Sequence, residues 1–177
     1  MSPQDGLLLL LAVFPILVIV AAVTDATSYT IPNWISLALL AAFVPAAVVA
    51  WYALVPGAVL ATNVGVGFAA LLVGMAMFSF GWIGGGDAKL LAACCLWLGL
   101  PAIAPFLFWT TIFGGGLAML LLVARRHGAQ FVGPGAPAWF ARLFSREADV
   151  PYGVAIAFGA LMAFPEGALT TGVLLPF

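Results

Sequence analysis

Long apolar runs separated by short polar breaks dominate the chain. A helix that crosses the hydrocarbon of a membrane needs about 20 apolar residues. Four runs qualify or nearly qualify, namely residues 7–23, 34–54, 57–80 and 152 to about 171. The first run has no basic segment before it and no clear small-residue cleavage site, so we expect a retained helix rather than a signal peptide.

Residues 88–124 form a longer apolar stretch that contains two prolines, the second of them Pro105. One long bent helix or two crossings would both fit this length. Loops rich in Lys and Arg stay on the cytoplasmic side of a membrane. Lys89 and Arg125 flank the stretch and share a side only if it crosses twice, so we predict two crossings with the turn nearer Pro105 than Gly99.

The composition supports a membrane protein. Of the 177 residues, 66% are hydrophobic and 6% are charged, whereas about 25% of residues are charged in soluble domains. We therefore expect an all-α integral membrane protein, a polytopic bundle of about six transmembrane helices that forms a single domain over residues 1–177. Cys94 and Cys95 are adjacent, lack the spacing of metal ligands and are interpreted as buried core.

The basic residues set the expected orientation. All five are Lys89, Arg125, Arg126, Arg142 and Arg146. With the arginine-containing loop in the cytoplasm, the connection over residues 24–33 is cytoplasmic too, and both termini lie outside. The external segments then contain no Lys or Arg.

The loop over about residues 125–150 contains a candidate interfacial helix. Trp139, Phe140, Leu143 and Phe144 fall on one helical face, while the arginines of this segment point elsewhere. Anchoring in the membrane surface is the simpler role, and a direct part in binding a substrate or partner is the alternative. We interpret His127 as a helix-end residue at headgroup level rather than a catalytic base.

Two of the six acidic residues need an explanation. Asp5 and Glu166 fall near the outer surface, and two further acids lie in the basic loop. Asp25 and Asp87 remain, both at cytoplasmic ends of predicted spans. An ionisable side chain at membrane depth is a functional candidate. The alternative is that each marks a helix end, with the charge of Asp87 favoured at a helix N-terminus and offset by Lys89.

Unusual backbone chemistry flanks both acids. Gly84, Gly85 and Gly86 precede Asp87; glycines permit dihedral angles closed to other residues and let another chain approach closely. Pro32 and Asn33 suit the start of the second span, where proline fixes φ and asparagine can satisfy free amides. A second glycine triplet, residues 114–116, has no acid beside it, and helix packing explains it better.

If Asp25 and Asp87 meet in the folded bundle, they cannot easily both ionise and should share one proton near neutral pH. One carboxylate can then take a proton from water while the other donates to a carbonyl oxygen, which is general acid–base hydrolysis of a peptide bond. This chemistry requires neither a metal nor a cofactor. The sequence also contains no HExxH zinc motif and no phosphate-binding loop.

Three sequence blocks carry a family resemblance. "DATSYTIPN" from Asp25, "GGGDAK" from Gly84 and "PYGVA" from Pro151 occur in this order and resemble the type IV prepilin peptidases, membrane aspartyl proteases with a GxGD motif. The resemblance implies catalytic roles for Asp25 and Asp87. It also matches Gly84, Gly86 and Lys89 to the motif and its basic position, and Pro151, Tyr152 and Gly153 to the PYG block.

The resemblance implies a substrate and a location as well. The family removes a short, usually basic leader from a prepilin, after a glycine and beside the hydrophobic segment, at the cytoplasmic face of the bacterial inner membrane. The expected partners are therefore the prepilin and membrane lipid, with no nucleic acid.

In its small size the chain resembles the short TadV/CpaA-like branch of the family, which serves Flp pili. Longer members carry a cysteine-rich insertion and methylate the new N-terminus; this chain lacks the insertion, so we expect no N-methyltransferase activity.

Two other classes of function remain open at this point. A transporter or channel could carry protons or cations on the same two aspartates, and would place acids deep within the spans. A structural subunit of a secretion system would tolerate the replacement of Asp87 by Asn.

Overall fold

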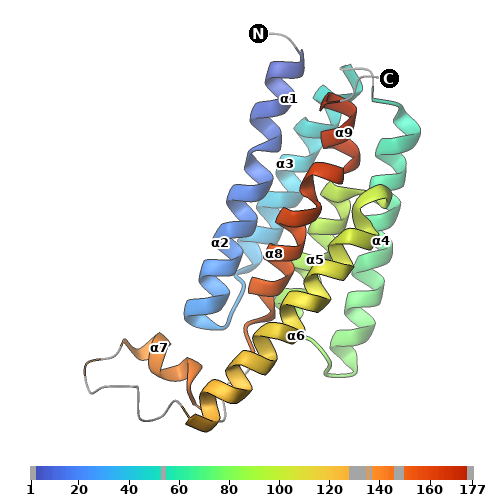
Figure 1. The fold of residues 1–177 in the computed structure, drawn as a ribbon. Coiled ribbons are helices and arrows are strands. Elements are labelled where there is room, and N and C mark those ends of the chain that lie inside the picture. The colour runs from blue at the N-terminus through green and yellow to red at the C-terminus, as the bar shows by residue number, and fades with distance from the viewer. Residues whose placement is uncertain (1–2, 53–54, 128–134, 136, 146–149, 175–177) are drawn as a thin grey trace.

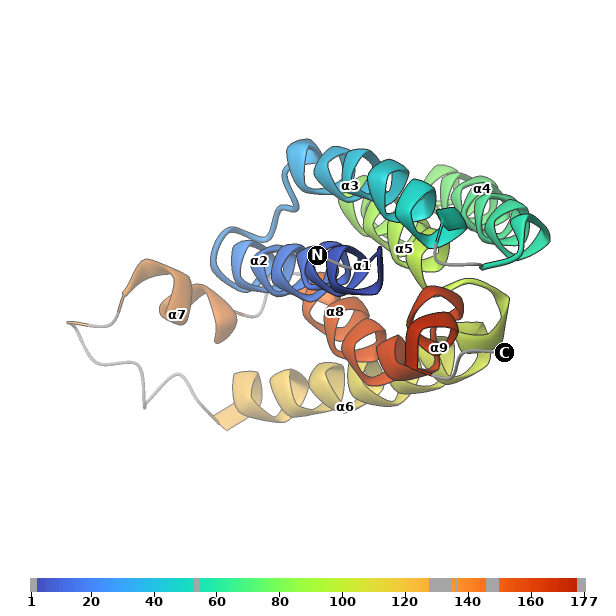
Figure 2. The same cartoon turned by 90° about the horizontal axis from the view of Figure 1, so that it is seen from above.

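The computed structural model describes residues 3–52, 55–127, 135, 137–145 and 150–174, and all regular elements among them are helices. The bundle is shown in Figure 1 and from above in Figure 2. The elements are α1 (Pro3–Leu11), α2 (Val13–Ser28), α3 (Asn33–Tyr52), α4 (Gly57–Ser79), α5 (Gly85–Leu98), η1 (Leu100–Ala102), α6 (Ile103–His127), α7 (Ala138–Leu143), α8 (Tyr152–Ala163), η3 (Phe164–Glu166) and α9 (Ala168–Leu174).

The predicted all-α membrane fold is confirmed, with five helices long and apolar enough to cross a membrane among the described residues. These are Asp5–Ser28, Asn33–Tyr52, Gly57–Ser79, Leu100–Arg126 and Tyr152–Thr171. The sixth predicted span corresponds to α5, which has 14 residues. At 1.5 Å per residue, α5 is about 21 Å long, shorter than the roughly 30 Å of membrane hydrocarbon. Among the described residues, five helices are thus long enough to span the membrane, and the shorter α5 stands where the sixth span was predicted.

The turn between α5 and α6 lies at Gly99 and η1, so the prediction of a turn nearer Pro105 is wrong. Gly99 has φ of +69°, a conformation that L side chains rarely adopt, and it ends α5. Pro105 belongs to the first turn of α6, where a missing N–H costs no helical hydrogen bond. The chain still reverses direction here, so the start of α5 and the end of α6 share one end of the bundle (Figure 1).

Helix α8, which begins the last span, lies inside the bundle. In Figure 2, α8 lies among α2, α5 and α6, and it packs against all three. Small residues make this possible: Gly159 faces the backbone of Thr110 in α6, where an added Cβ would come within 2.7 Å of the amide nitrogen. Cys94 and Cys95 are buried in α5, as predicted.

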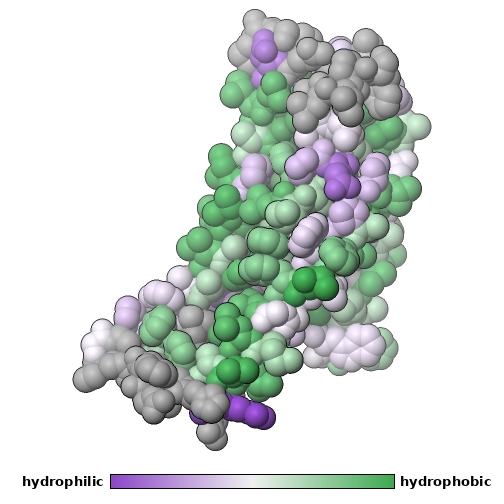
Figure 3. Space-filling view, in the orientation of Figure 1, coloured by the Kyte–Doolittle hydropathy of each residue, from purple (hydrophilic) through white to green (hydrophobic). Residues whose placement is uncertain are grey.

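The outer surface of the bundle is apolar. Figure 3 shows hydrophobic side chains along its flank, and many large apolar residues of α3, α4 and α6 are exposed. Such extensive exposure of apolar side chains suits a lipid environment. Charged side chains are concentrated near the helix ends, including the two arginines that end α6.

A short helix, α7, lies beside the bundle in Figures 1 and 2, in the loop where an interfacial helix was predicted. Phe140 contacts Trp139 and Phe144 through their rings. The position of α7 in a membrane surface stays a prediction. Arg146, Glu147 and Asp149 lie outside the described residues, as do the side chains of His127, Arg142 and Leu143.

Candidate active site

Asp25 lies within α2, not in the loop predicted to follow the first span. Hydroxyl groups in the last turn of this helix bond back to its carbonyls: Thr27 donates to the carbonyl of Val23 at 2.7 Å, and Ser28 donates to that of Thr24 at 2.6 Å. The polar side chains of this turn thereby have acceptors within the helix. The helix ends at Tyr29, which adopts a left-handed conformation with φ of 57°. The side chain of Asp25 is thereby directed into the bundle, where only 5% of the residue is exposed.

Gly153, at the start of α8, holds the carboxylate of Asp25. Its backbone N–H donates a 2.7 Å hydrogen bond to Oδ2 of Asp25. A Cβ at position 153 would lie 2.8 Å from that oxygen and 2.7 Å from Cδ1 of Ile31, so only glycine fits. The residues alone suggested only a helix start for this segment. The family block was the one signal in the sequence that pointed to Gly153.

Asp87 occupies the first turn of α5, directly after the glycine triplet. The N–H of Gly84 forms a hydrogen bond with its carboxylate. Gly84 itself has φ of −69°, open to any residue, so the expectation that special dihedral angles require these glycines is wrong at this position. Close approach is the reason at Gly86, where an added Cβ would lie 3.1 Å from Cβ of Ile31.

The fold brings Asp25 and Asp87 to one pocket of about 250 Å³. Its other lining residues are Tyr29, Thr30 and Ile31 from the α2–α3 connection and Gly84, Gly85 and Gly86 from the start of α5. Asp87 lies outside the five full-length spans. The pKa of Asp87 is raised from 3.8 to about 6: burial has the largest effect, the negative charge of Asp25 acts in the same direction, and the N–H of Gly84 opposes both. The two carboxyl groups thus interact electrostatically.

Lys89 and Asn33 join the two segments that line this pocket. The Nζ of Lys89 donates a 2.8 Å hydrogen bond to Oδ1 of Asn33, which begins α3. The sequence instead predicted that Asn33 satisfies free amides at the start of its helix. It also predicted that Lys89 offsets the charge of Asp87. Pro32 directly precedes α3, as predicted.

The PYG block begins α8. Pro151 is buried and is the residue before the helix, and its carbonyl accepts the N–H of Val154 at 3.2 Å. Tyr152 is exposed, in line with the interface tyrosine suggested by the residues. Of the predicted site residues, Asp25, Gly84, Gly86 and Asp87 line the pocket, and Gly153 contacts it through Asp25.

The fold and this site define a multi-pass helical membrane protein with two carboxyl groups in one pocket at an end of the bundle. Residues 12–119, which include both aspartates, match the model of the type IV leader peptidase family. This region is more than half of the chain, so the chain belongs to the type IV leader peptidase family, and the family prediction is confirmed.

A curated relative gives the same result. The chain is 32% identical over 159 residues to a prepilin leader peptidase/N-methyltransferase of Bacillus subtilis (strain 168). The matched region covers 88% of this chain and 54% of the relative, so the chain spans about half the length of that protein. No solved structure matches.

Proposed function

We propose that the chain is a membrane aspartyl endopeptidase that removes the short basic leader of a prepilin. One observation carries the proposal: Asp25 and Asp87, far apart in the sequence, line the same pocket. The family to which the chain belongs supports peptide-bond hydrolysis as the reaction.

The two carboxyl groups differ in their surroundings, which supports different roles. The N–H of Gly153 stabilises the ionised form of Asp25, which then takes a proton from the attacking water. Asp87, whose pKa is raised to about 6, holds the shared proton and donates it to the carbonyl oxygen of the scissile bond. As the tetrahedral intermediate collapses and its C–N bond breaks, Asp25 passes the proton that it took from water to the leaving amine, and a hydroxyl of the intermediate returns a proton to Asp87. Every proton transfer occurs within the pair and the water.

The proposed active-site side is the cytoplasmic face of the bacterial inner membrane. The α2–α3 connection, the start of α5 and the basic end of α6 all lie at one end of the bundle (Figure 1). Basic segments favour the cytoplasm, which leaves both termini in the periplasm. A basic leader stays in the cytoplasm too, so its junction with an apolar helix reaches the membrane at the level of this pocket.

Cleavage without methyl transfer is the proposed activity, as in the short TadV/CpaA-like branch with Flp-type prepilins as substrates. Only residues 29–32 connect α2 with α3, so no inserted domain stands between these helices. The B. subtilis relative carries both activities in its name and is longer.

The transporter alternative is less well supported. Asp25 and Asp87 lie together at one end of the bundle, whereas a proton or cation pathway needs polar groups along its depth. The other two described acids, Asp5 and Glu166, belong to α1 and η3, toward the opposite end (Figure 1).

The test is coexpression with a prepilin, followed by a gel shift and N-terminal sequencing of the product. Asp25→Asn and Asp87→Asn should each abolish processing while the protein still inserts in the membrane, because a lone carboxylate cannot supply both proton transfers. Asp5→Asn, remote from the pocket, is the matched control and should leave processing intact. Cleavage retained by either site variant would overturn the proposed pair.

A further inference from the structure

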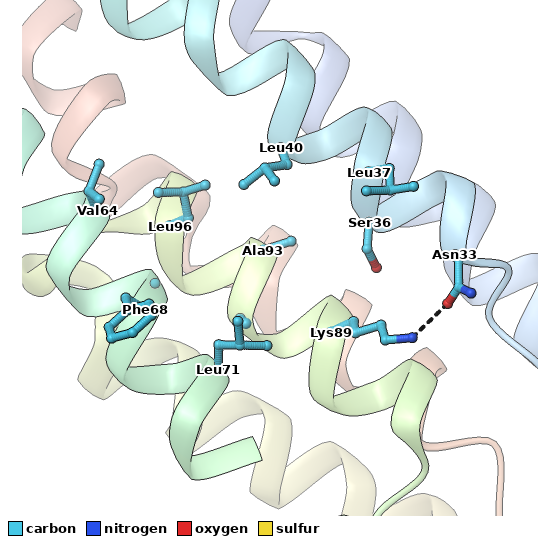
Figure 4. A pocket seen from close by; sticks show the side chains of 12 residues that line it. Asn33, Ser36, Leu37, Leu40, Val64, Phe68, Leu71, Lys89, Ala93 and Leu96 are labelled. Atoms are coloured by element: carbon cyan, nitrogen blue, oxygen red, sulfur yellow. Dashed lines mark hydrogen bonds between the residues drawn. The ribbon is translucent and has the colours of Figure 1, made fainter. Parts of the chain in front are cut away.

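A second pocket, larger than the site of the two aspartates, opens between α3 on one side and α4 and α5 on the other (Figure 4). We call it the α3/α4/α5 groove. Its volume is about 570 Å³, and its lining is apolar except at one end. Asn33, Ser36 and Lys89 form that polar end, where the hydrogen bond from Lys89 to Asn33 is drawn in Figure 4.

The packing of the three helices explains the groove. α4 lies close to α5 because of a glycine: Gly67 faces Leu96, where an added Cβ would lie 2.8 Å from Cβ of the leucine. α3 is tied to α5 by the Nε1–H of Trp97, which donates to the carbonyl of Leu39 at 2.9 Å. Apolar side chains on the groove walls are left exposed by the described helices: Leu37 and Phe68 are each 62% exposed.

The polar end of the groove adjoins the site of the two aspartates. Lys89 follows Asp87 by two residues on the same helix, so the two side chains lie at one depth on different faces of α5. Asn33 lies two residues after Ile31, which lines the smaller pocket. A segment that lies in the groove therefore ends at the depth of the two carboxyl groups. The part of α5 that lines the groove, from Lys89 to Leu96, is about 10 Å long, or two helical turns.

We propose that the α3/α4/α5 groove binds the apolar helix of the substrate directly after the scissile bond, an inference that rests on the proposed peptidase function. An apolar helix face suits the walls. The first N–H groups of a helix have no intrahelical acceptor, and an unsatisfied amide is costly inside a membrane. Oδ1 of Asn33 and the hydroxyl of Ser36 are acceptors at the required end. The scissile residue then lies in extended conformation beside Asp25 and Asp87.

Two adjacent leucines of α4 offer a matched test. Leu71 lines the groove, whereas Leu72 does not line it and is 51% exposed on the surface. Leu71→Trp should fill the groove, and Leu72→Trp should add the same side chain to the lipid-facing surface. The substrates are a synthetic prepilin with a basic leader ending in glycine before about 20 apolar residues, and a version whose apolar segment is replaced by a soluble Gly/Ser tail.

Leu71→Trp should lower kcat/KM for the apolar substrate by about tenfold, the equivalent of 1.4 kcal/mol of transition-state binding, and leave kcat/KM for the soluble one unchanged. Leu72→Trp should behave as wild type with both. Equal effects of the two variants, or equal losses with both substrates, would overturn the groove as a helix site. Wild-type protein that cleaves neither substrate would instead contradict the proposed function itself.

Photocrosslinking provides a second readout that does not depend on a bulky substitution. A benzophenone amino acid at Leu40, on the α3 wall, should capture the apolar substrate in the Asp87→Asn background, which binds without cleaving. The same probe at Leu120, exposed on α6, is the control and should not capture it. Capture of phospholipid alone at Leu40 would identify the groove as a lipid site and overturn the proposal.

Discussion

The backbone N–H of Gly153 donates a 2.7 Å hydrogen bond to the carboxylate of Asp25, across a sequence separation of 128 residues. The contact joins α2 and the start of α8 at the pocket that contains Asp87. A backbone N–H cannot rotate away as a side-chain donor can. The position of the carboxylate therefore depends on the position of α8 as a whole.

Replacement of Gly153 by Ala should displace Asp25. The new Cβ would lie within 2.9 Å of the carboxylate and of Ile31, an overpacking that costs about 1–3 kcal/mol of stability. Processing should fall strongly because the carboxylate loses its position. Thermal unfolding in detergent and the gel-shift assay measure the two effects. Gly116→Ala is the control, since its Cβ meets nothing within 4 Å; equal behaviour of the two variants would contradict the contact.

Protein stability should depend on pH through Asp87. Its pKa is raised from 3.8 to about 6, so the folded protein binds this proton more tightly than the unfolded chain. The resulting stability is fully present below pH 3.8 and is lost as the pH rises through about 6. Wild type should therefore melt at a lower temperature at pH 7 than at pH 4.5, and Asp87→Asn should show a smaller difference. An identical pH dependence in both proteins would count against the shifted pKa.

Lys89→Ala should weaken processing without abolishing it. The hydrogen bond from Lys89 to Asn33 is exposed, so its loss is expected to cost about 1 kcal/mol, or roughly a fivefold fall in kcat/KM. If Lys89 acts through Asn33, the double variant with Asn33→Ala should lose little more than either single variant. Unchanged kinetics in Lys89→Ala would remove Lys89 from the site, and fully additive losses would separate the two residues.

Two glycines of α4 should respond in opposite directions to alanine. Gly67→Ala should lower stability by about 1–3 kcal/mol, because its Cβ would lie 2.8 Å from Leu96 and 3.0 Å from the backbone of that residue. Gly65→Ala meets nothing within 4 Å and should raise stability by about 0.5–1 kcal/mol through a stiffer helix. The difference between their melting temperatures tests the close packing of α4 on α5.

Much of this architecture follows from local patterns in the sequence. Apolar runs of about 20 residues predicted four of the long helices, and the basic residues predicted that Lys89 and Arg125 share one end. The positions of the basic residues also predicted that Asp25 and Asp87 lie on the same side of the membrane. Lipid solvation makes such patterns informative, because a spanning helix must be apolar along its whole length.

Other features depend on contacts that no local pattern encodes. Asp25 was expected in a loop because the apolar run ends at Val23, but α2 continues to Ser28, with Thr27 and Ser28 bonded back to helix carbonyls. The end of α5 was misplaced because prolines were taken as the turn, whereas the positive φ of Gly99 makes it. The bond from Gly153 to Asp25 arises only when α8 packs against α2.

The dependence of Asp25 on Gly153 has a consequence during synthesis. A ribosome adds about 5–20 residues per second, so the 128 residues between them take roughly 6 to 26 s to emerge. Throughout that interval the N–H of Gly153 is not available to this carboxylate. The pair of carboxyl groups proposed to be catalytic is therefore complete only after the start of α8 has been made.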